Sequence, residues 1–129
     1  MNEWCLTLIT ECAHEVHAEL GGGLSEHIYQ NALACALRAR GTSLTVETEV
    51  AIPVTFKGTY VGFVRADLVV NKCIVLELKA VAKVTEAHLV QLRTYLKWVS
   101  PLINAAPTQG LVINFGALHV EIHSDAQVD

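Results

Sequence analysis

The stretch RADLVVNKCIVLELKA, residues 65–80, decides the fold because it holds two apolar runs joined by a short polar segment. The runs are rich in valine, leucine and isoleucine, and β-branched residues favour strands. Asn71-Lys72 between them is typical of a turn. We therefore expect two antiparallel strands, about Thr59 to Val70 and Cys73 to Ala80.

Three charged residues lie inside these apolar strands. Glu77 and Lys79 are two residues apart, so the alternation of a strand places both on one face. Asp67 stands opposite Glu77 on that face only if opposed residue numbers sum to 144, as 67 and 77 do. That sum requires a three-residue turn, Asn71 to Cys73, or a bulge nearby. A two-residue turn would put the two carboxylates on opposite faces.

This cluster suits a divalent metal ion held against a phosphate group. Mg²⁺ (or Mn²⁺) takes oxygen ligands, which Asp67, Glu77 and the carbonyl oxygen of Leu78 provide. Lys79 then lies beside the attacked phosphate or orients the attacking water. A Glu-x-Lys triplet is a weak signal by itself, because an ion pair on a solvated face is its usual explanation.

Around this hairpin, the spacing of apolar residues predicts three helices and three further strands. Steps of three and four indicate the helices, while a period of two or a short apolar run indicates the strands. The helices are expected at about Asn2–Leu20, Ser25–Arg40 and Thr85–Val99, and the strands at Leu44–Phe56, Leu111–Phe115 and, as a half-exposed edge, His119–His123. Pro101 is expected beyond the third helix, in a loop from Ser100 to Gln109. The order is ααβββαββ, an α/β fold (α+β with a mixed sheet) whose first three strands form an antiparallel meander.

Polar residues on two of these helices are candidates for the same cluster. Gln91 and Tyr95 are four apart on the third helix and share a face, which His88 joins. This row either forms an exposed flank or points at the metal. Glu26 shares a helical stripe with Tyr29, and it is either a first-turn glutamate that suits the helix dipole or a further metal carboxylate.

Length and composition predict one domain over residues 1–129, with 52% of the residues hydrophobic and 17% charged. No apolar run is long enough to span a membrane, and we see no secretory signal, so we expect a cytoplasmic protein without a membrane partner. The four cysteines form no Cys-x-x-Cys pair, which favours buried thiols over disulfides or zinc. The net charge of −4 neither supports nor excludes a nucleic-acid partner.

Other polar residues receive structural interpretations. His14 and His17 are three apart, not four as in zinc proteases, and we expect His17 to make a hydrogen bond near the glycine turn. His119 and His123 are expected on a solvated face. Asn114 lies inside an apolar strand, and the residues alone do not explain it.

Several motifs together carry a resemblance that covers nearly the whole chain. They are Gly23-x-x-Glu26-x-x-Tyr29, Glu15-Val16-His17, Arg65-Ala66-Asp67-Leu68, Leu76-Glu77-Leu78-Lys79-Ala80, His88-x-x-Gln91-x-x-x-Tyr95 and Ile113-Asn114-Phe115-Gly116. In this combination the chain resembles the GxxExxY proteins of the PD-(D/E)XK nuclease superfamily. Two features depart from the pattern: Ala66 replaces the usual proline, and the stretch from Ser100 to Gln109 looks longer.

The resemblance implies a restriction-endonuclease-like αβββαβ core, here with an extra N-terminal helix and a C-terminal edge strand. It also implies roles for single residues. Asp67 would be the superfamily's aspartate, Glu77 and Lys79 its E-x-K, Gln91 and Tyr95 its Gln-x-x-x-Tyr motif, and Glu26 the metal-assisting glutamate of the first core helix.

Three hypotheses follow from the sequence. The first is a magnesium-dependent nuclease that cuts phosphodiester bonds in DNA or RNA. The second is a catalytically silent module on the same fold that binds nucleic acid or protein. The third is a subunit of a homo-oligomer such as a homodimer, with the apolar surplus at its interface.

Overall fold

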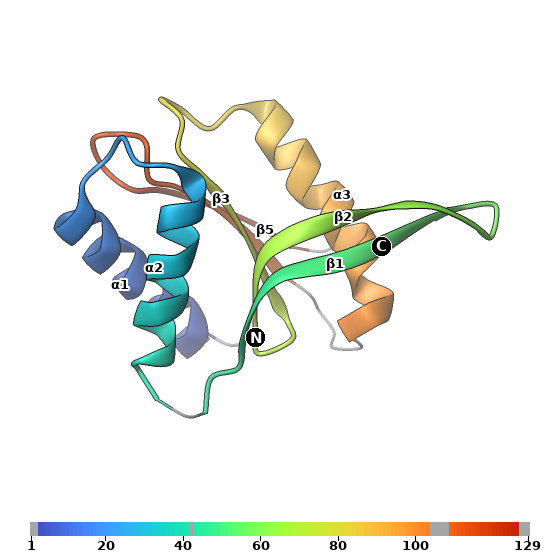
Figure 1. Ribbon diagram of the computed structural model, residues 1–129, viewed down its shortest axis with the longest axis horizontal. Helices are drawn as coiled ribbons and strands as arrows, with labels where there is room; N and C mark the ends of the chain where they lie inside the picture. The colour runs from blue at the N-terminus through green and yellow to red at the C-terminus, as the bar shows by residue number, and fades with distance from the viewer. Residues whose placement is uncertain (1–2, 42, 104–108, 127–129) are drawn as a thin grey trace.

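A computed structural model describes residues 3–41, 43–103 and 109–126 (Figure 1). The elements are α1 (Glu3–Leu20), α2 (Glu26–Arg38), β1 (Val46–Phe56), β2 (Thr59–Val70), β3 (Ile74–Lys79), α3 (Glu86–Ile103), β4 (Gln109–Asn114) and β5 (Glu121–Ala126). The predicted order ααβββαββ is confirmed. None of the described helices has the length and apolar character needed to cross a membrane.

The strands form one mixed sheet in the order β1-β2-β3-β4-β5. β1, β2 and β3 are antiparallel neighbours, as the predicted meander requires. β4 is parallel to β3, with α3 as the crossover between them, and β5 is antiparallel to β4. β3 is therefore the central strand. Figure 1 shows α1 and α2 on one face of the sheet and α3 on the other.

Two apolar cores lie on the two faces of this sheet. Tyr29 and Leu33 of α2 pack with Leu76 and Leu78 of β3 on one face. On the other face, Leu92 and Leu96 of α3 belong to the cluster that includes Val75 and Val112. Because side chains alternate along β3, Glu77 falls on the face that α3 covers.

Both β1 and β2 exchange their faces partway along. Ala66 belongs to the core on the α3 side, yet Leu68 belongs to the opposite core although both numbers are even. Across from them, Val46 and Val50 differ in the same way, and Glu49 between them has a φ of 51°. The large apolar residues predicted for the first strand, Leu44 to Phe56, all have even numbers, which predicts one shared face. They do not share it, because the positive φ of Glu49 reverses the alternation.

Several predicted element ends are wrong, at α3, β4 and β5. α3 continues to Ile103, through Pro101, instead of ending at Val99. The fixed φ of proline, about −65°, is a helical value, so the last turn includes Pro101 at the cost of one backbone hydrogen bond and of crowding with the carbonyl four residues earlier. The predicted loop therefore does not begin at Ser100, and its residues 104–108 lie outside the described residues. β5 runs from Glu121 to Ala126 instead of from His119 to His123, because its ladder with β4 runs from Asn114↔Glu121 to Gln109↔Ala126. For the same reason Gln109, predicted in the loop, begins β4.

Candidate functional site

The turn between β2 and β3 has the length that the carboxylate cluster requires. The paired residues are Leu68↔Leu76, Val69↔Val75 and Val70↔Ile74, and each pair sums to 144. Asn71 and Lys72 reverse the chain with φ values of 52° and 54°, and the amide of Cys73 donates to the carbonyl of Val70 over 3.1 Å. The predicted three-residue turn is confirmed, and the same sum of 144, continued one residue past the ladder, would pair Asp67 with Glu77.

The side chain of Asp67 bonds to β3 just past the end of the β2–β3 ladder. After the pair Leu68↔Leu76, the Oδ2 atom of Asp67 accepts a hydrogen bond from the Leu78 amide, 2.7 Å away. The carboxylate thus occupies the place of a strand carbonyl, at the point where β2 exchanges its faces. A residue in an antiparallel ladder directs its N–H and C=O to the same neighbour. The carbonyl of Leu78 therefore points to the β2 side, as a metal ligand beside Asp67 would.

Glu77 is a buried carboxylate without a sufficient set of partners. Only 4% of the residue is exposed, and its Oε1 atom is buried with no hydrogen-bond partner. Burial first and the Asp67 carboxylate second raise the pKa of Glu77, which reaches about 8 although Lys79 acts in the opposite direction. Burial also raises the pKa of Asp67, against the bond from Leu78. Two crowded carboxylates with an unpartnered oxygen fit a site for a divalent cation.

A chain of hydrogen bonds connects Lys79 to the face of α3 predicted from the sequence. The Nζ atom of Lys79 donates to Oε1 of Gln91 over 3.0 Å, and Nε2 of Gln91 donates to the hydroxyl of Tyr95 over 3.3 Å. The pKa of Tyr95 is raised by burial first and by the carboxylate of Glu77 second, so this hydroxyl lies within the field of the site. The structure therefore brings Lys79, Gln91 and Tyr95 together beside Glu77.

His88, predicted on the same stripe, serves the start of the helix. Its Nδ1 atom accepts a hydrogen bond from the backbone amide of Thr85 over 3.0 Å. Thr85 immediately precedes α3, so the contact resembles a capping box in which the third helical residue reaches back to the N-cap amide. The predicted polar row is reduced to Gln91 and Tyr95.

Glu26 lies at the beginning of α2 and is exposed. Its charge raises the pKa of both Asp67 and Glu77, although as a minor cause. Among residues 3–41, 43–103 and 109–126, no three His, Cys, Asp or Glu side chains converge closely enough to form a metal site alone. The role of Glu26 as a ligand stays a prediction.

Tyr29, the last residue of the Gly-x-x-Glu-x-x-Tyr motif, holds the loop that leads to Glu26. Its hydroxyl donates to the carbonyl of Gly21 over 2.6 Å and accepts from the amide of Leu24 over 3.1 Å. Its ring stacks on Phe115 with centroids 4.7 Å apart. The tyrosine of the motif therefore holds the loop that precedes Glu26.

Asn114 is a positioning residue that the sequence did not explain. It pairs with Lys79 across β3 and β4 and is fully buried. Its Oδ1 accepts from the amides of Val81 (3.0 Å) and Gly116 (2.9 Å), and its Nδ2 donates to the Val81 carbonyl and to Glu121 Oε1, both at 2.8 Å. A Cβ at Gly116 would clash with the backbone of Val81. These contacts fix the chain where it leaves Lys79; a buried asparagine in an apolar strand was the available signal.

Three other histidines, His14, His17 and His123, contact backbone or side-chain oxygens. A ring nitrogen of His17 lies 3.1 Å from the carbonyl of Ala117, which confirms the predicted hydrogen bond near the glycine turn. His14 contacts the Thr10 carbonyl within α1. His123 lies 3.4 Å from Glu121 on β5.

A family model of the PD-(D/E)XK nuclease superfamily matches residues 3–124, a range that contains every residue of the site. No curated protein and no solved structure matches the chain. The mixed five-stranded sheet between helices agrees with the restriction-endonuclease-like fold of that superfamily.

Proposed function

This chain belongs to the PD-(D/E)XK nuclease superfamily, and we propose that it is a magnesium-dependent nuclease that hydrolyses phosphodiester bonds in nucleic acid. The observation that carries the proposal is the buried Glu77 carboxylate of β3, whose Oε1 atom has no hydrogen-bond partner. Asp67 on the neighbouring strand β2 provides the second carboxylate. Lys79 follows two residues later on the same face. This combination of two carboxylates and a cation is suited to a metal-bound phosphate.

The donor set matches the needs of magnesium. Mg²⁺ in phosphate chemistry is usually held by one or two carboxylates together with waters and substrate phosphates. Asp67, Glu77 and the carbonyl oxygen of Leu78 would hold it, and Mn²⁺ has the same preference for oxygen. The ion, when bound, supplies positive charge at the phosphate and a water of lowered pKa.

The side chains of the site have separate tasks in this proposal. Lys79 presents its ammonium group to the phosphate oxygens or to the attacking water. Gln91 fixes the direction of that ammonium group through the 3.0 Å bond, and Tyr95 in turn holds the Gln91 amide. The Asp67 carboxylate is kept in place by the Leu78 amide. Preorganised groups of this kind stabilise the charge that develops in the transition state.

Several finer assignments accompany the proposal. We assign the chain to the GxxExxY branch on Gly23, Glu26 and Tyr29, and we propose that Glu26 assists the metal. We also propose that residues 1–129 act as one nuclease-like domain, since both cores pack on a single sheet. The cytoplasmic location and the homodimer stay predictions.

The direct test is cleavage of end-labelled DNA and RNA with magnesium, with manganese and with a chelator. We expect metal-dependent cleavage by the wild type and its loss in Lys79→Ala and Asp67→Asn. Lys83→Ala and Glu47→Gln, which remove exposed groups outside the site, are matched controls purified in the same way. Unchanged cleavage in both site variants would overturn the mechanism. Calorimetric titration with Mn²⁺ provides a second readout, because Glu77→Gln should weaken binding without any substrate present.

The net charge of −4 favours one rival, a binding module on the same fold without turnover. That module would bind nucleic acid or protein with equal strength in magnesium and in chelator. It would show no cleavage under any metal condition. The cleavage assay and a binding assay performed together therefore separate the two functions.

A further inference from the structure

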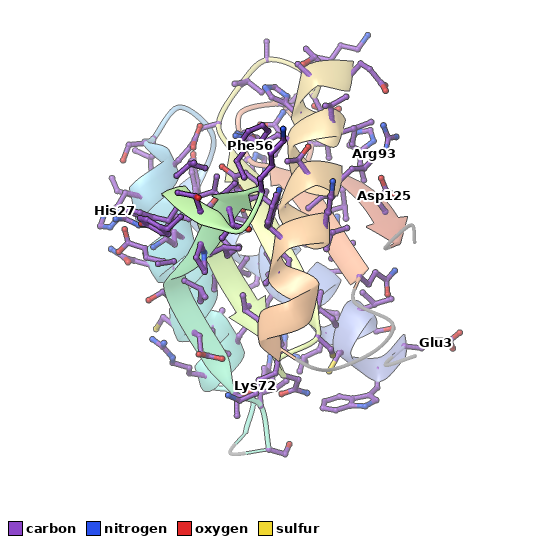
Figure 2. The ribbon with its side chains drawn as sticks, turned by 90° about the vertical axis from the view of Figure 1, so that its right-hand side faces the viewer. Glu3, His27, Phe56, Lys72, Arg93 and Asp125 are labelled. Atoms are coloured by element: carbon purple, nitrogen blue, oxygen red, sulfur yellow. The ribbon has the colours of Figure 1, made fainter. Side chains whose placement is uncertain are left out.

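The β1–β2 hairpin carries an exposed aromatic surface that the proposed site does not use. Figure 1 shows this hairpin extending beyond the body of the molecule, and Figure 2, where it points toward the viewer, shows Phe56 at its end. Phe56, Tyr60 and Phe63 are 64%, 60% and 52% exposed. We define residues 51–65 as the arm. Three large exposed rings on one projecting hairpin indicate a binding surface.

The charge of the arm is opposite to that of the rest of the chain. Residues 51–65 contain Lys57 and Arg65 and neither aspartate nor glutamate, whereas the remaining residues carry seven Lys or Arg against thirteen Asp or Glu. The guanidinium of Arg65 lies 5.7 Å from the centroid of the Phe63 ring, and the ammonium of Lys57 lies 5.5 Å from that of Phe56. The arm thus presents exposed rings and cations together, which suits an anionic partner with flat groups.

The strand register places part of this surface in line with the site. Tyr60, Phe63 and Arg65 pair with Thr55, Pro53 and Ala51 of β1. Ala51, Pro53 and Thr55 alternate with Val50 and Ile52 of the α3 side, so their three partners share the opposite face. Tyr60 joins this face because the register shifts between Val54 and Thr55. Phe63 precedes Asp67 by four residues, about 13 Å along an extended strand. The metal site lies on the α3 side, so the path along β2 from the aromatic face reaches Asp67 where this strand exchanges its faces, between Ala66 and Leu68.

We propose that the arm binds single-stranded nucleic acid, stacks its bases on Tyr60 and Phe63, and leads the strand toward Asp67. The inference rests on the proposed function, because it assigns the substrate class of the same site. Unpaired bases expose the flat faces that aromatic rings stack on, whereas a duplex hides them in its stack. Lys57 meets the backbone phosphates, and Arg65, whose guanidinium lies 3.8 Å from the Glu49 carboxylate, exchanges that partner for a phosphate. Stacking without base-edge contacts makes this binding tolerant of sequence.

The test measures binding and cleavage separately on the full chain. Fluorescence anisotropy in chelator follows the binding of labelled oligothymidylate and oligouridylate of about 15 nucleotides, and of a duplex of equal length. Tyr60→Ala and Phe63→Ala should each weaken single-strand binding about tenfold or more. Trp4→Ala removes a similarly exposed ring on α1 and should leave binding unchanged. Circular dichroism confirms that each variant is folded.

Two conservative variants separate stacking from simple apolar contact. Tyr60→Phe keeps the ring and should bind as the wild type does, whereas Phe63→Leu keeps the apolar bulk without the ring and should bind as weakly as Phe63→Ala. Phe63→Leu that binds normally would overturn the stacking interface. Sedimentation that shows the arm holding two copies of the chain together, with Phe63→Ala becoming monomeric, would also overturn it.

The outcomes distinguish this inference from the proposed function. If the arm variants bind and cleave at wild-type levels, the arm has no role in binding, and the proposed nuclease function still holds. If the arm variants lose single-strand binding but the wild type shows no metal-dependent cleavage, the arm is a binding surface and the proposed nuclease function is wrong. A duplex bound as tightly as the single strand, or no nucleic-acid binding by the wild type, overturns the arm.

Discussion

The ammonium nitrogen of Lys79 lies 3.0 Å from the side-chain oxygen of Gln91, and this contact joins the central strand β3 to the crossover helix α3. An amide side chain suits this position because it accepts from Lys79 and donates to Tyr95 at the same time. The lysine is therefore held in one direction beside the buried Glu77. Its orientation depends on a residue outside the Glu-x-Lys triplet.

Replacement of Gln91 by alanine should slow cleavage without unfolding the protein. The ammonium group of Lys79 loses the acceptor that directs it, and misplacing a catalytic group by about 1 Å lowers rates by about 100-fold. We expect the single-turnover rate at saturating substrate to fall by about 10- to 100-fold. Thr94→Ala, at an exposed position of the same helix, is the control. A Gln91→Ala enzyme as fast as the control would remove Gln91 from the mechanism.

Glu77→Gln should stabilise the metal-free protein at alkaline pH. The pKa of Glu77 is raised by burial to about 8, from 4.5, so the folded state holds a proton that the unfolded state releases. This contribution to stability is complete below pH 4.5 and is lost as the pH rises through about 8. Glutamine carries no charge and avoids the loss. The variant should therefore gain on the order of 1 kcal/mol or more over the wild type at pH 8.

Urea unfolding in the presence of a chelator, at several values between pH 5 and about pH 8, measures this difference. Glu47→Gln, on an exposed part of β1, should show a constant difference from the wild type over the same range. Added magnesium should stabilise the wild type and leave Glu77→Gln nearly unchanged, because a ligand stabilises only the state that binds it. A pH-independent gain in Glu77→Gln would contradict the buried-charge explanation.

The sequence predicted the element order and the turn between β2 and β3 because both depend on local spacing. Strand parity fixed the length of the turn once Asp67 and Glu77 were assumed to share a face, and the register agrees. The same parity rule was wrong for β1. A glutamate at a φ of 51° has no distinctive sequence signal, so the exchange of faces at Glu49 was not predictable from alternation.

The site was predictable where one helix face or one strand face carries it, as for Glu77 with Lys79 and Gln91 with Tyr95. Asn114 was not predictable, because its four partners come from the loop after β3, from Gly116 and from β5. Only tertiary packing brings these segments together. His88 was placed on the same helical face as Gln91 and Tyr95, but its side chain bonds the Thr85 amide instead of the site. That bond depends on how the helix begins, which the spacing of residues does not predict.

Asn114→Ala should destabilise the fold and misplace Lys79. The substitution removes four hydrogen bonds at a fully buried position and leaves the Val81 amide and carbonyl without partners. Each buried group left unsatisfied costs about 1–3 kcal/mol. We expect a loss of several kcal/mol, about 2–5, in the free energy of unfolding, measured in urea. Asn31→Ala, on an exposed position of α2, should change it by less than about 0.5 kcal/mol.

Tyr29→Phe tests whether the tyrosine of the Gly-x-x-Glu-x-x-Tyr motif acts through structure. Phenylalanine preserves the stack on Phe115 and removes only the hydroxyl that bonds Gly21 and Leu24. Each lost hydrogen bond costs about 0.5–1.5 kcal/mol, so unfolding should become easier by about 1–3 kcal/mol. Tyr60→Phe removes an exposed hydroxyl and is the matched control.

The effect of Tyr29→Phe on cleavage separates positioning from stability. The hydroxyl fixes the loop before Glu26, so loosening that loop should weaken Mn²⁺ binding in calorimetry if Glu26 assists the metal. The double variant Tyr29→Phe with Glu26→Gln should then bind Mn²⁺ no more weakly than Glu26→Gln alone, because both changes act on the same carboxylate. Additive losses in the double variant would show that Tyr29 acts on the site independently of Glu26.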